Sequence, residues 1–200
     1  MNNAQKKETH KNYGYHYIYL IDRSESMTEY EADAVNGFNS MIARQKESGE
    51  YDTKVTTYFF DDETELIHDQ LSLKDVPPLT TQSFHARGCT ALLDAMGYAM
   101  HHAPSDPDRK TVFSIITDGY ENSSTKYHLS EISKTIEEKK NNGWEFLFLG
   151  ADIDSIIESA KLGISAECTY DFDRSPDGFR SCYDTICQKI EKIKKERPNA

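Results

Sequence analysis

The chain has 200 residues, of which 37% are hydrophobic and 28% charged, a composition typical of one large globular domain. Its formal net charge of -11 at pH 7 argues against a nucleic-acid-binding surface, because an acidic chain repels phosphates. No apolar run reaches the length of a membrane span, and the first residues lack the apolar core of a signal peptide. We therefore expect a protein that engages neither nucleic acid nor membrane.

Cysteine usage predicts the compartment. The four cysteines are Cys89, Cys168, Cys182 and Cys187. They form no CxxC pair, and this pattern suits free thiols in a reducing environment. The expected location is the cytoplasm.

The predicted elements alternate along most of the chain. Residues 1–14 are polar and predict a disordered arm, and residues 15–197 predict a single domain. Apolar and β-branched runs predict strands at 15–21, 52–60, 65–73, 111–116, 144–149 and 166–172. Apolar residues at helical spacing predict helices at 29–47, 90–102, 129–140, 152–162 and 179–195. We expect an α/β fold, in which a doubly wound, mostly parallel sheet carries helices on both faces.

Three oxygen-rich loops follow predicted strands or precede a predicted helix. Asp22-Arg23-Ser24-Glu25-Ser26 follows strand 15–21, Gly88-Cys89-Thr90 begins the helix at 90–102, and Asp118-Gly119 follows strand 111–116. Ligands of open α/β sheets bind at the carboxyl ends of the strands, near the switch in strand order. The side chains expected to converge there are Asp22, Ser24, Ser26, Thr90 and Asp118.

These side chains predict a metal site. Hydroxyl and carboxylate oxygens are hard ligands that suit Mg²⁺ or Mn²⁺, with Ca²⁺ less favoured, and they suit zinc and copper poorly. The alternation of the first loop lets its Asp and Ser side chains converge while Arg23 and Glu25 point away. Two carboxylates and three neutral hydroxyls would leave a divalent ion under-neutralised. We therefore expect the ion to attract one more anionic ligand.

The same residues resemble the metal-ion-dependent adhesion site of von Willebrand factor A (vWA) domains. The matching segments read DRSESM at 22–27, GCTALLD at 88–94 and TDG at 117–119. The resemblance covers the chain from about Tyr15 to Cys187 and is closest to the stand-alone bacterial and phage members. It implies a six-stranded, Rossmann-like sheet with one antiparallel edge strand, which segment 65–73 would supply.

The resemblance also implies a role for each candidate ligand. Ser24, Ser26 and Thr90 would reach the metal directly or through water. Asp22 and Asp118 would do so directly or as anchors bridged by water. A protein partner's Asp or Glu carboxylate would take the remaining position. The implied function is a metal-dependent protein-interaction module rather than an enzyme.

Two positions depart from the family pattern. Glu25 stands where family members commonly have a small residue, and its anion could raise the affinity for the ion or repel the partner's carboxylate. Some adhesion receptors carry paired acids after the first loop for an adjacent ion, whereas this chain has Glu29 and Tyr30 there. We therefore expect one ion rather than two.

Two alternative functions remain open. A metal-dependent phosphohydrolase could use Asp22 as its nucleophile, but Ser24 stands where such an enzyme would carry a second acid. No GxGxxG or P-loop lysine signature is present to cradle a phosphate. The second alternative is a scaffold of the same fold that binds no ion in the cell.

Two charged segments have simpler interpretations. The segment at 171–178 lacks the glycine and glutamate that an EF-hand requires, because Pro176 and Cys182 occupy those positions. It is therefore predicted to be an acidic loop. The lysine-rich segment at 189–197 predicts the solvated face of the last helix.

Overall fold

The computed structural model describes residues 14–48, 52–104 and 106–196. The predicted disordered arm at 1–14 lies outside the described residues except for Gly14, which belongs to the first strand and not to an arm. The prediction of a single domain at 15–197 stays a prediction.

One six-stranded sheet runs through the described residues, in the order β3-β2-β1-β4-β5-β6. The strands are β1 (Gly14–Asp22), β2 (Thr53–Phe60), β3 (Thr64–Ser72), β4 (Arg109–Thr117), β5 (Glu145–Ala151) and β6 (Thr169–Phe172). The pairings are parallel except that between β2 and β3, which is antiparallel. The predicted antiparallel edge strand is thereby confirmed.

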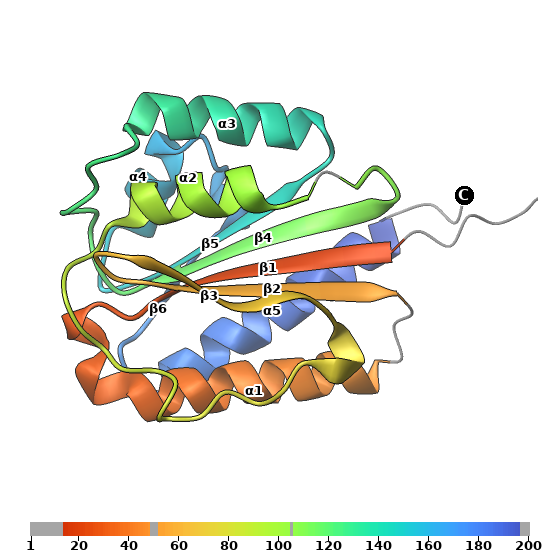
Figure 1. Cartoon of the computed structure of the whole chain (residues 1–200), viewed down its shortest axis with the longest axis horizontal. Coiled ribbons are helices and arrows are strands. Elements are labelled where there is room, and N and C mark those ends of the chain that lie inside the picture. The colour runs from red at the N-terminus through yellow and green to blue at the C-terminus, as the bar shows by residue number, and fades with distance from the viewer. Residues whose placement is uncertain (1–13, 49–51, 105, 197–200) are drawn as a thin grey trace, which may run out of the picture.

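Helices cover both faces of the sheet (Figure 1). On one face lie α1 (Glu31–Glu47) and α5 (Pro176–Glu196), and on the other lie α2 (Leu92–His102), α3 (Leu129–Asn141) and α4 (Ser155–Lys161). Successive side chains of a strand point to opposite faces, so Tyr17 and Tyr19 of β1 belong to the core under α1 and α5. Ile18 and Leu20 belong to the core under α2 and α3. The predicted α/β class, with a doubly wound sheet, is confirmed.

Some predicted boundaries were wrong. Residues 25–30 form a 3-10 helix, η1 (Glu25–Tyr30), so α1 begins two residues later than predicted. The strand predicted at 166–172 begins with another 3-10 helix, η3 (Ala166–Cys168), and a third, η2 (Leu73–Asp75), follows β3. The last helix begins at Pro176 instead of residue 179, because the fixed φ of proline suits the first turn of a helix.

The order of the strands places two loops side by side. β1 lies between β2 and β4, and Ile21 of β1 pairs with Ile116 of β4. Because these two strands are parallel, the residues that follow them emerge together at one edge of the sheet. The loops that carry Asp22 and Asp118 therefore meet at the topological switch point.

Helix length bears on membrane insertion. None of the helices in the part of the chain that the structure describes is long and apolar enough to cross a membrane.

Candidate metal centre

Asp22 ends β1 with its side chain fully enclosed. Its exposed fraction is 0%, and both carboxylate oxygens accept hydrogen bonds. The backbone N–H of Ser24 donates to Oδ1 at 2.7 Å, and the hydroxyl of Thr117 donates to Oδ2 at 2.6 Å. These bonds fix Asp22 beneath the loop that follows β1.

Ser24, Ser26 and Asp118 form a continuous hydrogen-bonded chain. The two serine hydroxyl oxygens lie 3.0 Å apart, and the hydroxyl of Ser26 donates to Oδ1 of Asp118 at 2.7 Å. Ser24 and Asp118 are buried, whereas Ser26 is exposed. The loops after β1 and β4 thus converge as predicted, and one side of the cluster faces solvent.

Thr90 approaches the same cluster from the loop before α2. A Cβ atom added to Gly119 would lie 2.9 Å from the hydroxyl oxygen of Thr90, so this oxygen sits directly against the residue after Asp118. Asn122 holds Thr90 by two bonds, one accepted from its N–H at 2.9 Å and one donated to its carbonyl at 3.1 Å. α2 begins at Leu92, so Thr90 precedes the helix rather than starting it. No pattern in the sequence indicates that Asn122 positions Thr90.

Burial makes both carboxylates hard to ionise. It raises the pKa of Asp22 to about 6, although the hydrogen bonds from Thr117 and Ser24 act in the opposite direction. Burial also raises the pKa of Asp118, against the hydrogen bond from Ser26 and the charge of Arg174. A cation bound between these carboxylates would favour their charged forms.

Arg23 points away from the cluster, as predicted, but it is buried rather than solvated. Its Nε lies 2.7 Å from Oδ2 of Asp61, and its Nη1 lies 2.6 Å from Oε2 of Glu65. Asp61 follows β2 and Glu65 lies on β3, so Arg23 ties the loop after β1 to the hairpin of β2 and β3. Glu25 is exposed, and its N–H donates to the carbonyl of Gly88 at 3.1 Å.

Arg174 joins the cluster from a loop predicted to be acidic. Its Nη1 lies 3.5 Å from Oδ2 of Asp118, and its Nε lies 2.7 Å from Oδ2 of Asp152. It is the one basic residue of the segment at 171–178, which is the only signal in the sequence that could have drawn attention to it.

The donor set fits a hard divalent cation. Two buried carboxylates and three hydroxyls, all oxygen donors, gather at the carboxyl ends of β1 and β4. Within residues 14–48, 52–104 and 106–196, no group of three or more His, Cys, Asp and Glu side chains could hold a metal. A metal at this cluster therefore depends on its hydroxyl oxygens, which favour Mg²⁺ or Mn²⁺ over softer ions.

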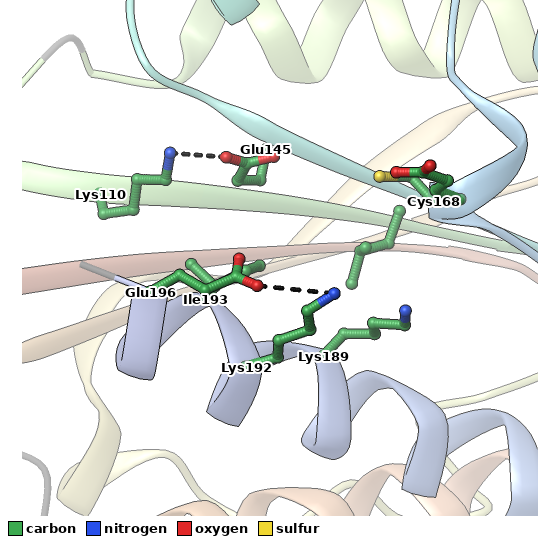
Figure 2. A pocket seen from close by; sticks show the side chains of 9 residues that line it. Lys110, Glu145, Cys168, Lys189, Lys192, Ile193 and Glu196 are labelled. Carbon is green, nitrogen blue, oxygen red and sulfur yellow. Dashed lines mark hydrogen bonds and ion pairs between the residues drawn. The ribbon is translucent and has the colours of Figure 1, made fainter.

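A groove elsewhere in the molecule is separate from this cluster. It has a volume of about 720 Å³ and lies between α5 and the first residues of β4 and β5 (Figure 2). Lys110 and Glu145, on the neighbouring strands β4 and β5, form an ion pair of 2.7 Å on the sheet side of the groove. Lys110 stands near the start of β4 and Asp118 follows the end of that strand, so these two residues lie about 26 Å apart along the sheet.

Comparison with known proteins identifies the fold. No family model and no curated protein matches the chain. Among solved structures, it is similar to proximal thread matrix protein 1 from the mussel byssus with a zinc-occupied MIDAS motif (16% identity, 90% of this chain and 46% of that one, TM-score 0.66). It is also similar to the pilus adhesin SpaC from Lactobacillus rhamnosus GG (13% identity, 90% and 30%, TM-score 0.70). A von Willebrand factor type A protein from Catenulispora acidiphila is a third (16% identity, 88% and 42%, TM-score 0.59).

The chain spans less than half the length of each of these proteins. At such low identities the likeness concerns the fold, and the sheet order with its antiparallel edge strand agrees with it. The chain therefore has the fold of von Willebrand factor A domains.

Proposed function

We propose that the chain is a protein-interaction module that binds one divalent ion, Mg²⁺ or Mn²⁺, and uses it to hold an Asp or Glu carboxylate of a protein partner. The residues that would hold the ion are Asp22, Ser24, Ser26, Thr90 and Asp118. The observation that carries the proposal is the hydrogen-bonded chain from Ser24 through Ser26 to Asp118. These contacts hold the oxygen donors close together, and this supports the proposal that they bind one ion.

The arrangement of charge supports the need for an external anion. Both oxygens of Asp22 already accept hydrogen bonds from the protein, so its carboxylate is anchored beneath the cluster. Oδ1 of Asp118 accepts a hydrogen bond from Ser26, and its Oδ2 pairs with Arg174. Because both carboxylates are held by the protein, a divalent ion among these groups would keep open coordination positions toward solvent, on the side where Ser26 is exposed. A partner's carboxylate would fill such a position as an anionic oxygen ligand.

Two of the similar structures support the proposal at the level of the fold. The mussel protein has zinc at its MIDAS motif, and SpaC is an adhesin. The five candidate ligands of this chain are all oxygen donors, so we propose Mg²⁺ or Mn²⁺ rather than zinc for it.

The geometry of Asp22 supports a function other than catalysis. A nucleophilic carboxylate needs an oxygen that can reach a substrate. Asp22 has an exposed fraction of 0% and both of its oxygens are engaged, so a phosphohydrolase mechanism through this residue has no accessible nucleophile.

The thiols support a reducing location, which we propose to be the cytoplasm. All four cysteines lie among the described residues, and each is a free thiol. Burial raises the pKa of the Cys182 thiol, which keeps it protonated and unreactive.

Thermal unfolding of chelator-treated protein, with and without added Mg²⁺ or Mn²⁺, tests the proposal. An ion at about one hundred times its dissociation constant adds about 2.7 kcal/mol to the free energy of unfolding. For a domain of this size, the midpoint should rise by on the order of 5 to 10 °C. The rise should vanish in a Ser24→Ala, Ser26→Ala variant and persist in Ser181→Ala, a matched control at an exposed serine of α5.

The contrary results have separate meanings. An equal rise in native protein and in the double variant would place the ion elsewhere. No rise in either, also with excess acetate present, would favour a scaffold of the same fold that binds no ion.

A further inference from the structure

We propose that Arg174 is a specificity-determining residue of the metal centre. Its guanidinium competes with a divalent ion for Asp118 and adds a positive charge that draws an anionic ligand to the bound ion. This inference rests on the proposed function and concerns the balance between the two ligands of that site.

The two oxygens of Asp118 have different partners. Oδ1 accepts the hydrogen bond from Ser26, and Oδ2 faces Nη1 of Arg174 at 3.5 Å. The Asp118 side chain is 0% exposed, whereas that of Arg174 is 31% exposed. Arg174 therefore covers the outer side of a buried carboxylate, between that carboxylate and solvent.

A second carboxylate keeps Arg174 in this place. Its Nε lies 2.7 Å from Oδ2 of Asp152, which follows the end of β5 and is half exposed. The guanidinium thus bridges the residues that follow two neighbouring strands, β4 and β5. Its contact with Asp118 is the longer of the two, so that contact is the one a competing cation would displace more readily.

The backbone around Arg174 is tightly closed. The N–H of Ser175 donates to the carbonyl of Asp173 at 2.8 Å. The hydroxyl oxygen of Ser175 accepts a hydrogen bond from the N–H of Gly178 at 3.0 Å. A Cβ atom at Gly178 would collide with the carbonyl oxygen of Asp173, so only glycine fits this turn. The turn joins β6 to α5 and leaves Arg174 with a fixed point of attachment beside Asp118.

The charge of Arg174 has two opposite effects on the centre. It repels a divalent ion near Asp118 and lowers the affinity for that ion. It attracts a carboxylate that approaches the ion, and a guanidinium can donate paired hydrogen bonds to both oxygens of that carboxylate. The residue should therefore weaken metal binding and strengthen the coupling between the metal and its anionic ligand.

Electron paramagnetic resonance titration with Mn²⁺, in the absence and presence of acetate, tests this inference. We expect Arg174→Gln to lower the dissociation constant for Mn²⁺ about tenfold. Saturating acetate should tighten Mn²⁺ binding by a smaller factor in Arg174→Gln than in native protein, because the two ligands are coupled reciprocally. Arg174→Lys keeps the charge and should bind Mn²⁺ as the native protein does.

Arg180→Gln is the matched control, because Arg180 lies on α5, is 72% exposed and pairs with Asp177 at 3.0 Å. It should leave both quantities unchanged. A far-ultraviolet circular dichroism spectrum verifies that each variant is folded, and Arg174→Met, which also removes the charge, provides the measurement if Arg174→Gln is not folded.

The outcomes separate this inference from the proposed function. The role of Arg174, but not the proposed function, would be overturned if native protein and Arg174→Gln bind Mn²⁺ with equal affinity. It would also be overturned if Arg174→Lys binds Mn²⁺ as tightly as Arg174→Gln does. Binding by Arg174→Gln but not by native protein would support it. Absence of Mn²⁺ binding in every variant would overturn the proposed function, and the role of Arg174 with it.

Discussion

The hydroxyl of Ser26 donates a hydrogen bond of 2.7 Å to Oδ1 of Asp118, although the two residues are 92 positions apart in the chain. The contact exists because β1 and β4 are parallel neighbours, so the loops that follow them emerge at the same edge of the sheet. It joins two candidate ligands directly, and it makes the geometry of the centre depend on the packing of the loops.

Gly119 should be sensitive to substitution through Thr90. In Gly119→Ala the new Cβ would lie 2.9 Å from the hydroxyl oxygen of Thr90, a distance that requires one of them to move. We expect Mn²⁺ affinity to fall about tenfold or more, since a displaced ligand oxygen weakens a site built on few donors. Isothermal titration calorimetry measures this affinity.

A double-mutant cycle isolates the cause. The Cβ of Thr90 lies 3.8 Å from the same position, which is an ordinary contact. Gly119→Ala should therefore destabilise the Thr90→Ala protein less than the native protein in urea unfolding. Equal destabilisation in both backgrounds would show that the substitution does not act through the hydroxyl.

Asp61 should be among the most costly residues to remove. Its carboxylate is 2% exposed, accepts from Nε of Arg23 at 2.7 Å and from Nε of Arg87 at 2.8 Å, and its loss leaves the buried Arg23 partly unpaired. We expect Asp61→Ala to lower the free energy of unfolding by about 3 to 5 kcal/mol. Urea denaturation measures it.

Glu65→Gln is the comparison for Asp61→Ala, because Glu65 also pairs with Arg23 but is 55% exposed. Its cost should stay below about 1 kcal/mol. If the two substitutions cost the same, burial of the ion pair is not what makes Asp61 important.

Asp22 should make the metal-free protein less stable as the pH rises. Burial raises its pKa from the ordinary value of 3.8 to about 6, so the folded state holds the proton more tightly than the unfolded chain. Its contribution to stability is full below pH 3.8 and is lost as the pH rises through 6. The difference between native protein and Asp22→Asn, measured by unfolding in chelator, should shift against the native protein by at most about 3 kcal/mol between pH 4 and pH 7.

The comparison with Asp22→Asn cancels the titrating groups that do not interact with Asp22, and the effect of the Asp118 charge on Asp22 is part of the measured difference. A difference that does not change with pH, or that grows in favour of the native protein, would show that the Asp22 carboxylate is ionised without cost.

His16 should make the protein less stable as the pH falls, whereas Asp22 does so as the pH rises. Burial, together with the charge of Arg109, lowers its pKa to about 4, and its Nε2 lies 2.8 Å from the hydroxyl oxygen of Thr56. The unfolded chain takes up a proton near pH 6.5, so the folded state loses stability as the pH falls from 6.5 to 4. His16→Gln should remove at most about 3 kcal/mol of this loss of stability. A steeper acid transition in His16→Gln would contradict this account.

Much of the fold could be predicted because strong local patterns carry it. Residues 111–117 of strand β4 are all buried and mostly apolar, and such a run is typical of a sheet covered on both faces. The weaker alternation at β3 correctly indicated an edge strand. The boundaries were less accurate where short 3-10 helices, such as η3, join regular elements, since a single turn leaves no periodic pattern.

The contacts around the centre could be predicted only in part. The hydroxyl and carboxylate residues that follow the strands were visible, since the loops are short and end at one edge of the sheet. The sequence could not predict the contacts of Arg23, Asn122 and Arg174, because their partners lie on other loops and no local pattern encodes those distances. The burial of Arg23 depends on Asp61, which is brought near by the pairing of β1 with β2.

Anomalous diffraction from crystals soaked in Mn²⁺ tests the central claim most directly. The account predicts one anomalous peak among the oxygens of Ser24, Ser26 and Asp118, absent from crystals of the Ser24→Ala, Ser26→Ala variant. A saturating soak that gives no peak there, or a peak that persists in the variant, would contradict the claim that these side chains hold a divalent ion.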